Sequence, residues 1–257
     1  MPISVDLSDR VALVTGGSQG IGAGIASLLV EAGATVVTCA RSAVETPAPG
    51  TSHVRCDVRD PEAVAAMVQA LVAEHGRLDI LVNNAGGSPY ALAADASPRF
   101  LDKVLDLNLT APLIVAQAAN AVMQRQGGGS IVNISSVSAL RPSPGTAAYG
   151  AAKAGVDSLT RSLAVEWGPR VRVNSIDVGM VRTEQAHLHY GSEAAIEAVG
   201  KTVPLGRLAE PGEVGACAAF LASGLASYVS GATLRVHGGG EVPPFLAAAD
   251  VNQREDS

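Results

Sequence analysis

Tyr149 and Lys153 are the two residues of this sequence whose types and spacing best suit proton transfer. They lie within Ala147–Trp167, a segment without proline that predicts a helix, and at a spacing of four residues helix side chains share one face. A phenol has a reference pKa of about 10, and a nearby cation lowers it by stabilising the phenolate. Lowering it by roughly 3 units requires about 4 kcal/mol, which a lysine could supply together with a second positive charge. Tyr-x-x-x-Lys also occurs by chance, so its interpretation depends on the rest of the chain.

A glycine-rich segment near the N-terminus predicts a phosphate site. The predicted strand Val11–Thr15 is followed by Gly-Gly-Ser-Gln-Gly-Ile-Gly at positions 16–22 and by the predicted helix Ile21–Ala32. Glycines permit a sharp turn and the close approach of a pyrophosphate, whose charge is stabilised by the helix N-terminus. The spacing is Gly-x-x-x-Gly-x-Gly rather than Gly-x-Gly-x-x-Gly, and a glycine-rich turn alone can be structural. Its place between a strand and a helix favours phosphate binding.

Arg41 follows the second predicted strand, Thr35–Cys39. Dinucleotide-binding folds that prefer NAD carry an acid near this place for the ribose hydroxyls. Here no carboxylate repels a 2′-phosphate, and a guanidinium can bind one through two hydrogen bonds. The sequence therefore favours NADP(H) over NAD(H). The alternative is a solvated surface arginine in a protein that uses NAD, and Gln19 adds no second basic side chain inside the glycine turn.

The composition excludes several classes of protein. With 257 residues, 47% of them hydrophobic, the chain can form one large α/β domain or two small ones. A net charge of −6 and a pI near 5.3 argue against nucleic acid as a partner. We find no apolar run that could span a membrane and no secretory signal. The three cysteines form no metal-binding spacing, so no metal site is expected, and their odd number argues against a disulfide framework. We expect a cytoplasmic protein.

Short apolar segments alternate with longer helical segments along the chain. The predicted strands are Val11–Thr15, Thr35–Cys39, His53–Cys56, Ile80–Asn83, Ser130–Ser135, Arg172–Ile176 and Thr233–Val236. The predicted helices are Ile21–Ala32, Pro61–His75, Pro98–Asn108 continuing through Thr110–Gln124, Ala147–Trp167, Glu193–Gly200 and Pro211–Leu221. Continuous apolar strands separated by helices indicate a parallel sheet that is covered on both faces.

The expected fold class is therefore α/β: a single-domain, Rossmann-like, doubly wound parallel sheet of about seven strands, with helices on both faces. Residues 1–257 form one dinucleotide-binding and catalytic domain in this interpretation. Between Arg41 and His53 the chain is short and rich in proline and small residues, so the crossover helix is expected to be reduced to a turn or missing. Residues 247–257 turn polar and acidic and are expected to be a flexible tail, frayed or docked on a neighbouring subunit.

Six motifs in order carry a family resemblance. They are Thr-Gly-x-x-x-Gly-Ile-Gly at 15–22, Cys-Asp-Val at 56–58, Asn-Asn-Ala-Gly at 83–86, Asn108, Ile-Ser-Ser at 134–136, and Tyr149-x-x-x-Lys153. With these motifs the chain resembles the short-chain dehydrogenase/reductase family in its single-domain form, over nearly its whole length, from Leu7 to Gly240.

The resemblance implies a catalytic set. Tyr149 would be the general acid/base, and Lys153 would lower its pKa and bind the nicotinamide ribose. Ser136 would hold the substrate oxygen. The preceding Ser135 should point to the other side of its strand and is therefore not chosen. Asn108 resembles the asparagine that kinks its helix and holds a water linking Lys153 to solvent; capping within a broken helix is its alternative role, and both can hold together.

The resemblance also implies a set of cofactor contacts. These residues are Gly16, Ser18, Gln19, Gly20, Ile21, Gly22, Arg41, Asp57, Val58, Asn84, Ala85, Gly86, Tyr149, Lys153, Gly179, Val181 and Thr183. Asp57 and Val58 would border the adenine, and the Val181 backbone and the Thr183 hydroxyl would meet the nicotinamide carboxamide. For Asn83, tying neighbouring strands together and contacting the cofactor remain open alternatives.

Two positions depart from the family pattern. The family usually reads Pro-Gly after strand six, whereas this chain reads Asp-Val-Gly at 177–179, which loosens the turn that starts the substrate lid. His237 stands where the family commonly has aspartate, and we interpret it as a structural replacement near a subunit contact. Neither change affects the proposed proton relay.

The expected activity is hydride transfer between NADP(H), or NAD(H), and a secondary alcohol or ketone. The substrate would lie between residues 87–90, residues 139–146 and a lid at 180–203. A small or medium hydrophobic ketone, a 3-oxoacyl thioester, or a cyclic or steroid ketone would fit. Two alternatives remain: an epimerase or dehydratase on the same scaffold, and a non-catalytic NADP(H)-binding regulatory protein. The resemblance also implies a homotetramer or homodimer, paired through the helices Thr110–Gln124 and Ala147–Trp167.

Overall fold

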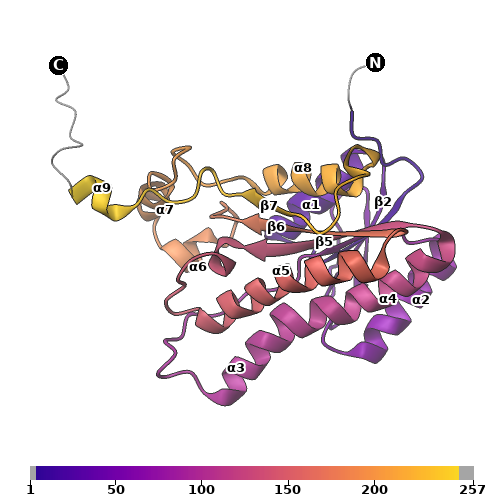
Figure 1. Cartoon of the computed structure of the whole chain (residues 1–257), viewed down its shortest axis with the longest axis horizontal. Coiled ribbons are helices and arrows are strands. Elements are labelled where there is room, and N and C mark those ends of the chain that lie inside the picture. Colours follow the sequence, from indigo (N-terminus) through magenta and orange to yellow (C-terminus); the bar gives the residue numbers. More distant parts are fainter. Residues whose placement is uncertain (1–3, 249–257) are drawn as a thin grey trace.

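A computed structural model describes residues 4–248 and contains one parallel sheet (Figure 1). Its strands are β1 (Val11–Thr15), β2 (Thr35–Ala40), β3 (Thr51–Arg55), β4 (Ile80–Asn83), β5 (Gly129–Ser136), β6 (Val171–Val178) and β7 (Thr233–Val236). Their order across the sheet is β3-β2-β1-β4-β5-β6-β7. The order reverses between β1 and β4, which is the point where dinucleotides bind in doubly wound folds. The predicted fold class is confirmed.

Helices cover both faces of the sheet (Figure 1). Their bounds are α1 (Gly20–Glu31), α2 (Pro61–His75), α3 (Pro98–Leu105), α4 (Ala111–Gln126), α5 (Ala147–Trp167), α6 (Ala186–Tyr190), α7 (Glu193–Gly200), α8 (Pro211–Ala222) and α9 (Pro244–Ala248). Helices α1 and α8 pack on each other on one face, and α2, α4 and α5 lie on the other. Within residues 4–248, no helix is long and apolar enough to cross a membrane.

Alternating residues of each central strand supply the two layers of core. In β1, Val11 and Leu13 pack toward α2 and α4, whereas Ala12 and Val14 pack toward α1 and α8. All five residues of β1 are buried, as expected for a parallel strand with helices on both sides. Such strands appear in the sequence as mainly apolar runs, which explains why β1 and β4 begin and end at the predicted residues. The less buried β7 also has its predicted bounds.

The connections differ more from the sequence prediction. The helix predicted through residues 98–124 is interrupted by the π-helical segment Asp106–Thr110, and the short helices α6 and α9 were not predicted. The connection from β2 to β3 contains no helix, as expected from its prolines. Helix α9 includes residues 247 and 248 of the predicted tail, and residues 249–257 of that tail lie outside the described part of the chain.

Candidate active site

The carboxyl ends of β1, β4, β5 and β6 surround a cavity of about 320 Å³. Twelve of the predicted cofactor residues line it: Gly16, Gln19, Gly20, Ile21, Gly22, Asn84, Ala85, Gly86, Tyr149, Lys153, Gly179 and Thr183. Five predicted contacts, Ser18, Arg41, Asp57, Val58 and Val181, do not line it. The cavity therefore joins the glycine turn to the predicted proton-transfer residues.

Close packing requires glycines in the turn between β1 and α1. A Cβ atom on Gly22 would lie 2.1 Å from the carbonyl oxygen of Gly16, and Gly16 has a positive φ of 63°. The amide of Asn84 donates to the carbonyls of Thr15 and Gly16, at 3.0 and 3.1 Å. Asn84 thus holds the glycine turn in place. Asn83 instead donates to the Asn133 side chain and the Pro112 carbonyl. These bonds tie neighbouring strands together, which is one of the two roles left open for Asn83.

A carboxylate already contacts the N-terminal end of α1. The backbone N–H of Gly20 donates to Oε1 of Glu184 at 2.8 Å. Glu184 comes from the loop after β6, immediately after Thr183. A helix N-terminus favours negative charge, so the carboxylate lies where the sequence predicts a pyrophosphate. The sequence analysis did not identify Glu184, because its contact with Gly20 arises only in the folded chain.

The predicted adenine side lies at the ends of β2 and β3. Arg41 is exposed. Arg59 binds the carboxylate of Asp57 through two hydrogen bonds, at 3.0 and 2.6 Å. The hydrogen bonds from Arg59 lower the pKa of Asp57 to about 2, and the charge of Arg41 adds a smaller effect in the same direction. The side chains of Val58 and Val181 are buried in the core, so any contact with a ligand would come from their backbones.

Lys153 is buried at the end of the cavity, with 3% of its surface exposed. Its ammonium donates to the carbonyl oxygen of Ile134 on β5 at 2.8 Å. The hydroxyl of Ser135 donates to the carbonyl oxygen of Lys153 at 3.2 Å, so Ser135 points toward α5. Burial lowers the pKa of Lys153 to about 8, and the charge of Asp157 opposes that shift. The ammonium therefore lies close to the range in which it can lose a proton.

Tyr149 lies between Ser136 and Lys153. The ammonium of Lys153 is 5.5 Å from the centre of the Tyr149 ring. Burial raises the pKa of the Tyr149 phenol, and a hydrogen bond with Ser136 lowers it by a smaller amount. This direction is opposite to the sequence expectation of a lowered pKa. The reason is geometric: the ammonium binds the Ile134 carbonyl, while the phenol loses hydration on burial.

Asn108 lies in the π-helical segment, beside Lys153. Its Oδ1 accepts from the N–H of Gly87 at 2.8 Å, and its Nδ2 donates to the carbonyls of Gly87 and Val104 at 2.9 Å. A Cβ atom on Gly86 would lie 2.7 Å from Oδ1 of Asn108 and 3.3 Å from Nζ of Lys153. The kink assigned to Asn108 is therefore present, and the side chain holds the loop after β4 against Lys153.

Two buried carboxyl groups that could not be identified from the sequence, Asp157 and Asp177, interact with each other, and the charge of Asp157 also acts on Lys153. Asp157 is one helical turn after Lys153 on α5, and Asp177 pairs with Ser135 across β5 and β6. Asp177 is fully buried, and neither of its carboxyl oxygens has a hydrogen-bond donor among the described residues. Burial and the neighbouring charge of Asp157 raise the pKa of Asp177 to about 6, although Ser135 and the charge of Arg235 oppose the shift.

His237 follows β7 and packs against Gly179, where a Cβ atom would lie 2.8 Å from His237. Gly179 and His237 both line a second cavity. This contact explains why residue 179 is glycine despite the missing proline of the turn. The interpretation of His237 as a replacement near a subunit contact stays a prediction.

The chain is similar to known proteins over most of its length. The family model described as "Enoyl-(Acyl carrier protein) reductase" matches residues 16–241. D-threitol dehydrogenase of Mycolicibacterium smegmatis is 39% identical over 256 residues, covering 92% of this chain and 96% of that protein. The 3alpha-hydroxysteroid dehydrogenase of Mediterraneibacter gnavus is 38% identical and covers 90% of this chain and 97% of that protein. The solved structure of Thermoplasma acidophilum aldohexose dehydrogenase has a TM-score of 0.87 at 35% identity, and covers 91% and 95% of the two chains.

Asp177 should make stability depend on pH. The pKa of Asp177 is raised in the folded chain, so the folded state binds more protons than the unfolded state between about pH 4 and 6. The contribution of Asp177 to the stability of the protein therefore falls as pH rises through that window. We expect Asp177→Asn to remove this loss, because an amide cannot ionise. Between pH 4 and 7, the free energy of unfolding of the variant should rise relative to that of the parent by on the order of 2 kcal/mol. Urea denaturation measures this difference.

Asp79→Asn provides a control of opposite sign. Burial alone would raise the pKa of Asp79, but hydrogen bonds from Arg77, Val11 and Arg10 outweigh it and lower the pKa. This variant should lose stability relative to the parent as pH rises through the acidic window up to about pH 4, where the parent's folded state ionises Asp79 before the unfolded state does. If the stability difference between Asp177→Asn and the parent stayed constant from pH 4 to 7, the raised pKa of Asp177 would be wrong.

Glu184 should compete with phosphate groups for the N-terminal end of α1. We expect Glu184→Gln to tighten the binding of NADPH or NADH about 3- to 10-fold, because the substitution removes a negative charge beside the predicted pyrophosphate site. Titration of cofactor fluorescence measures the effect. Glu193→Gln, which removes an exposed carboxylate on α7, is the control and should leave the affinity for NADPH and NADH unchanged. Weaker binding by Glu184→Gln would mean that Glu184 supports the cofactor rather than displacing it.

Proposed function

Because the chain belongs to the short-chain dehydrogenase/reductase family, and is an NAD(P)-dependent oxidoreductase of that family, we propose that Ser136, Tyr149, Lys153 and Asn108 catalyse its hydride transfer. The reaction interconverts an alcohol and a ketone. The observation that carries this assignment is the convergence of Tyr149, Lys153 and the glycine turn on one cavity, with Ser136 near enough to the Tyr149 phenol to lower its pKa.

The residues of the cavity fit a nicotinamide dinucleotide. The glycine turn leaves no room for a Cβ atom at Gly22, and the N–H of Gly20 holds the carboxylate of Glu184, an anion where the pyrophosphate would lie. Gly20, Ile21 and Gly22 would hold the phosphates, and Lys153, Gly179 and Thr183 the nicotinamide end. The bound cofactor supplies the hydride in the reduction and accepts it in the oxidation.

The side chains around the substrate oxygen divide the proton chemistry. Ser136 would donate a hydrogen bond to the carbonyl oxygen. The Tyr149 phenol would give its proton to that oxygen in the reduction and take it back in the oxidation. Lys153 would stabilise the phenolate, and its pKa of about 8 lets its ammonium exchange a proton near neutral pH. Asn108 would hold the loop after β4 and complete the relay toward solvent.

NADP(H) is the proposed cofactor in preference to NAD(H). Arg41 is exposed at the carboxyl end of β2, free to bind a 2′-phosphate. The nearest acid, Asp57, is already neutralised by two hydrogen bonds from Arg59. Arg41 and Arg59 therefore give this edge of the site a positive charge, which favours the additional phosphate. Ser18, Asp57 and Val58 would contact the adenosine half, and Val181 the nicotinamide carboxamide through its backbone.

The substrate is a small molecule that carries an alcohol or a ketone. The relatives act on D-threitol, a hydroxysteroid or an aldohexose according to their names, so a polyol, a sugar or a cyclic or steroid ketone are all proposed, together with a 3-oxoacyl thioester. Residues 180–203, which contain α6 and α7, would form the lid. The relatives named here are all dehydrogenases, which gives no support to a non-catalytic regulatory protein.

The assembly and location are proposals as well. Helices α4 and α5 would pair across two-fold axes in a homotetramer or homodimer of single-domain subunits. Val165 on α5 is 83% exposed, which suits burial by a second subunit. We propose a cytoplasmic protein.

Replacing the phenol tests the catalytic assignment. Tyr149→Phe should lower turnover by at least about 100-fold, because general acid–base catalysis typically contributes that much, while cofactor binding stays largely intact. The measurement is NADPH and NADH oxidation with ketones from small diketones to 3-oxoacyl thioesters and steroid ketones. Tyr228→Phe, at a fully exposed tyrosine, is the control. Unchanged turnover in Tyr149→Phe would refute the assignment of Tyr149.

Replacing Arg41 tests the cofactor preference. Arg41→Ala should weaken NADPH binding about 10- to 100-fold, because a charged hydrogen-bonding pair with the 2′-phosphate is lost, and should leave NADH binding nearly unchanged. Fluorescence titration of both cofactors measures the two affinities. Arg161→Ala, an exposed arginine on α5, serves as the control. Equal losses for NADPH and NADH would contradict a 2′-phosphate contact.

A further inference from the structure

A second cavity of about 230 Å³ adjoins the cofactor cavity at the carboxyl ends of β5, β6 and β7. Gly179 lines both cavities. Val137, which lines the second one, directly follows Ser136 in the chain. The two cavities therefore meet at Gly179, and Val137 places the second one next in the chain to Ser136, which we propose to hold the substrate oxygen, so the second cavity offers room for the rest of a substrate. Its volume is small for a ligand pocket, which favours a compact molecule.

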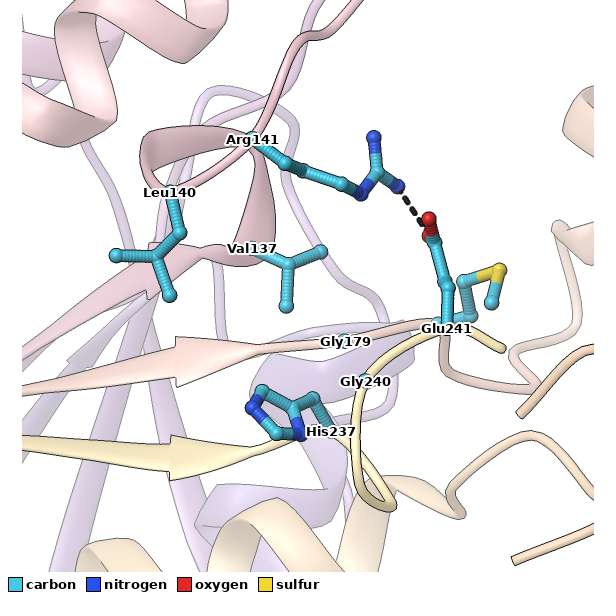
Figure 2. A pocket seen from close by; sticks show the side chains of 8 residues that line it. Val137, Leu140, Arg141, Gly179, His237, Gly240 and Glu241 are labelled. Atoms are coloured by element: carbon cyan, nitrogen blue, oxygen red, sulfur yellow. Dashed lines mark hydrogen bonds and ion pairs between the residues drawn. The ribbon is translucent and has the colours of Figure 1, made fainter. Parts of the chain in front are cut away.

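An ion pair forms one wall of this cavity (Figure 2). Nη2 of Arg141, from the loop after β5, donates to Oε1 of Glu241, from the segment after β7, at 2.5 Å. The two side chains are 38% and 37% exposed, so their remaining polar atoms are accessible to a ligand. Figure 2 shows the side chains of Val137 and Leu140 facing the same space. The cavity thus combines an apolar surface with one ion pair.

Two backbone hydrogen bonds connect the chain on either side of Glu241 to the end of the proposed lid and to the residues just after it. The N–H of Val242 donates to the carbonyl of Thr202, and the N–H of Leu205 donates to the carbonyl of Gly238. Burial raises the pKa of Tyr190 on α6, and the charges of Arg141 and Glu241 shift that pKa in opposite directions. The backbone next to Glu241 is therefore hydrogen-bonded to the end of the proposed lid, and Tyr190 of the lid lies within range of the charges of the ion pair.

The charges of Arg141 and Glu241 determine which substituent of a substrate can bind at this wall of the cavity. A carboxylate on the substrate would compete with Glu241 for the guanidinium and would remain close to the negative charge of Glu241. An ammonium would meet the same difficulty at Arg141. A hydroxyl can accept a hydrogen bond from Arg141 and donate one to Glu241 at the same time, without separating the pair. An apolar substituent would leave neither group with a new partner.

We propose that Arg141 and Glu241 select compact, uncharged substrates that carry a second hydroxyl group besides the reacting alcohol or ketone. The carbon skeleton would pack on Val137, Leu140 and Met180, and the second hydroxyl would bridge the guanidinium and the carboxylate. This inference rests on the proposed hydride transfer and names the class of substrate for it: polyols, hydroxyketones and hydroxylated cyclic alcohols.

Three ketones of matched shape test the inference: 4-hydroxycyclohexanone, 4-methylcyclohexanone and 4-oxocyclohexanecarboxylate. In the parent protein, kcat/KM should be at least about tenfold higher for the hydroxyketone than for the methyl ketone, because hydrogen bonds to charged groups are lost with the latter. The carboxylate should be the poorest substrate. In Arg141→Leu the ratio between hydroxyketone and methyl ketone should fall close to one. In Glu241→Gln the carboxylate should improve about tenfold, because Arg141 loses its competing anion.

Glu213→Gln is the matched control, because it breaks the Arg207–Glu213 ion pair, which is 2.7 Å long and exposed and lies outside the proposed lid and outside both cavities. It should leave all three values of kcat/KM unchanged. A preference for the carboxylate in the parent protein, or a hydroxyl preference that persists in Arg141→Leu, would overturn the role of the ion pair while leaving hydride transfer intact. Absence of turnover with these ketones and with the wider panel, despite cofactor binding, would instead overturn the proposed function and the inference with it.

Discussion

The buried ammonium of Lys153 is the constraint on which the geometry of the active site depends. A charge with 3% exposure needs a strong acceptor, and the Ile134 carbonyl on β5 supplies it. The Ser135 hydroxyl returns a hydrogen bond to the Lys153 carbonyl, so α5 is fastened to β5 at two points. Because Tyr149 lies one turn earlier on α5 and Ser136 is the next residue of β5, the same attachment brings the phenol and the hydroxyl together.

Acidic side chains near this ammonium and at the far end of the cavity add charges to the site that the Tyr149–Lys153 pair alone does not supply. Asp157 raises the pKa of Lys153 and thereby limits the effect of burial. Asp177 lies near Asp157, and its pKa is raised to about 6 by burial and by the charge of Asp157. At the other end of the cavity, Glu184 accepts a hydrogen bond from the N–H of Gly20. Burial raises the pKa of the Tyr149 phenol, while the Lys153 ammonium donates to the Ile134 carbonyl.

Much of the fold could be predicted from residue patterns. Strands β1 and β4 are buried on both faces, so each is apolar up to its last residue. Helix α2 begins with an Asp60 cap and ends before Gly76. The π-helical segment could not be predicted, because the helix is widened where the Asn108 side chain bonds to the Val104 and Gly87 carbonyls. Gly87 lies in a distant loop, and contact with it is decided by packing.

The sequence by itself determined the order of the elements, the glycine turn, the Tyr149–Lys153 spacing and the family, because each depends on residues close together in the chain. Only the tertiary structure decided which charges meet. Glu184 and Gly20 are separated by 164 residues, and Arg141 and Glu241 by 100. Asp177 lies opposite Ser135 through the pairing of β5 with β6, where it meets the charge of Asp157. Such contacts leave no periodic pattern in the sequence, since they depend on the strand order and on the path of the loops at the carboxyl edge of the sheet.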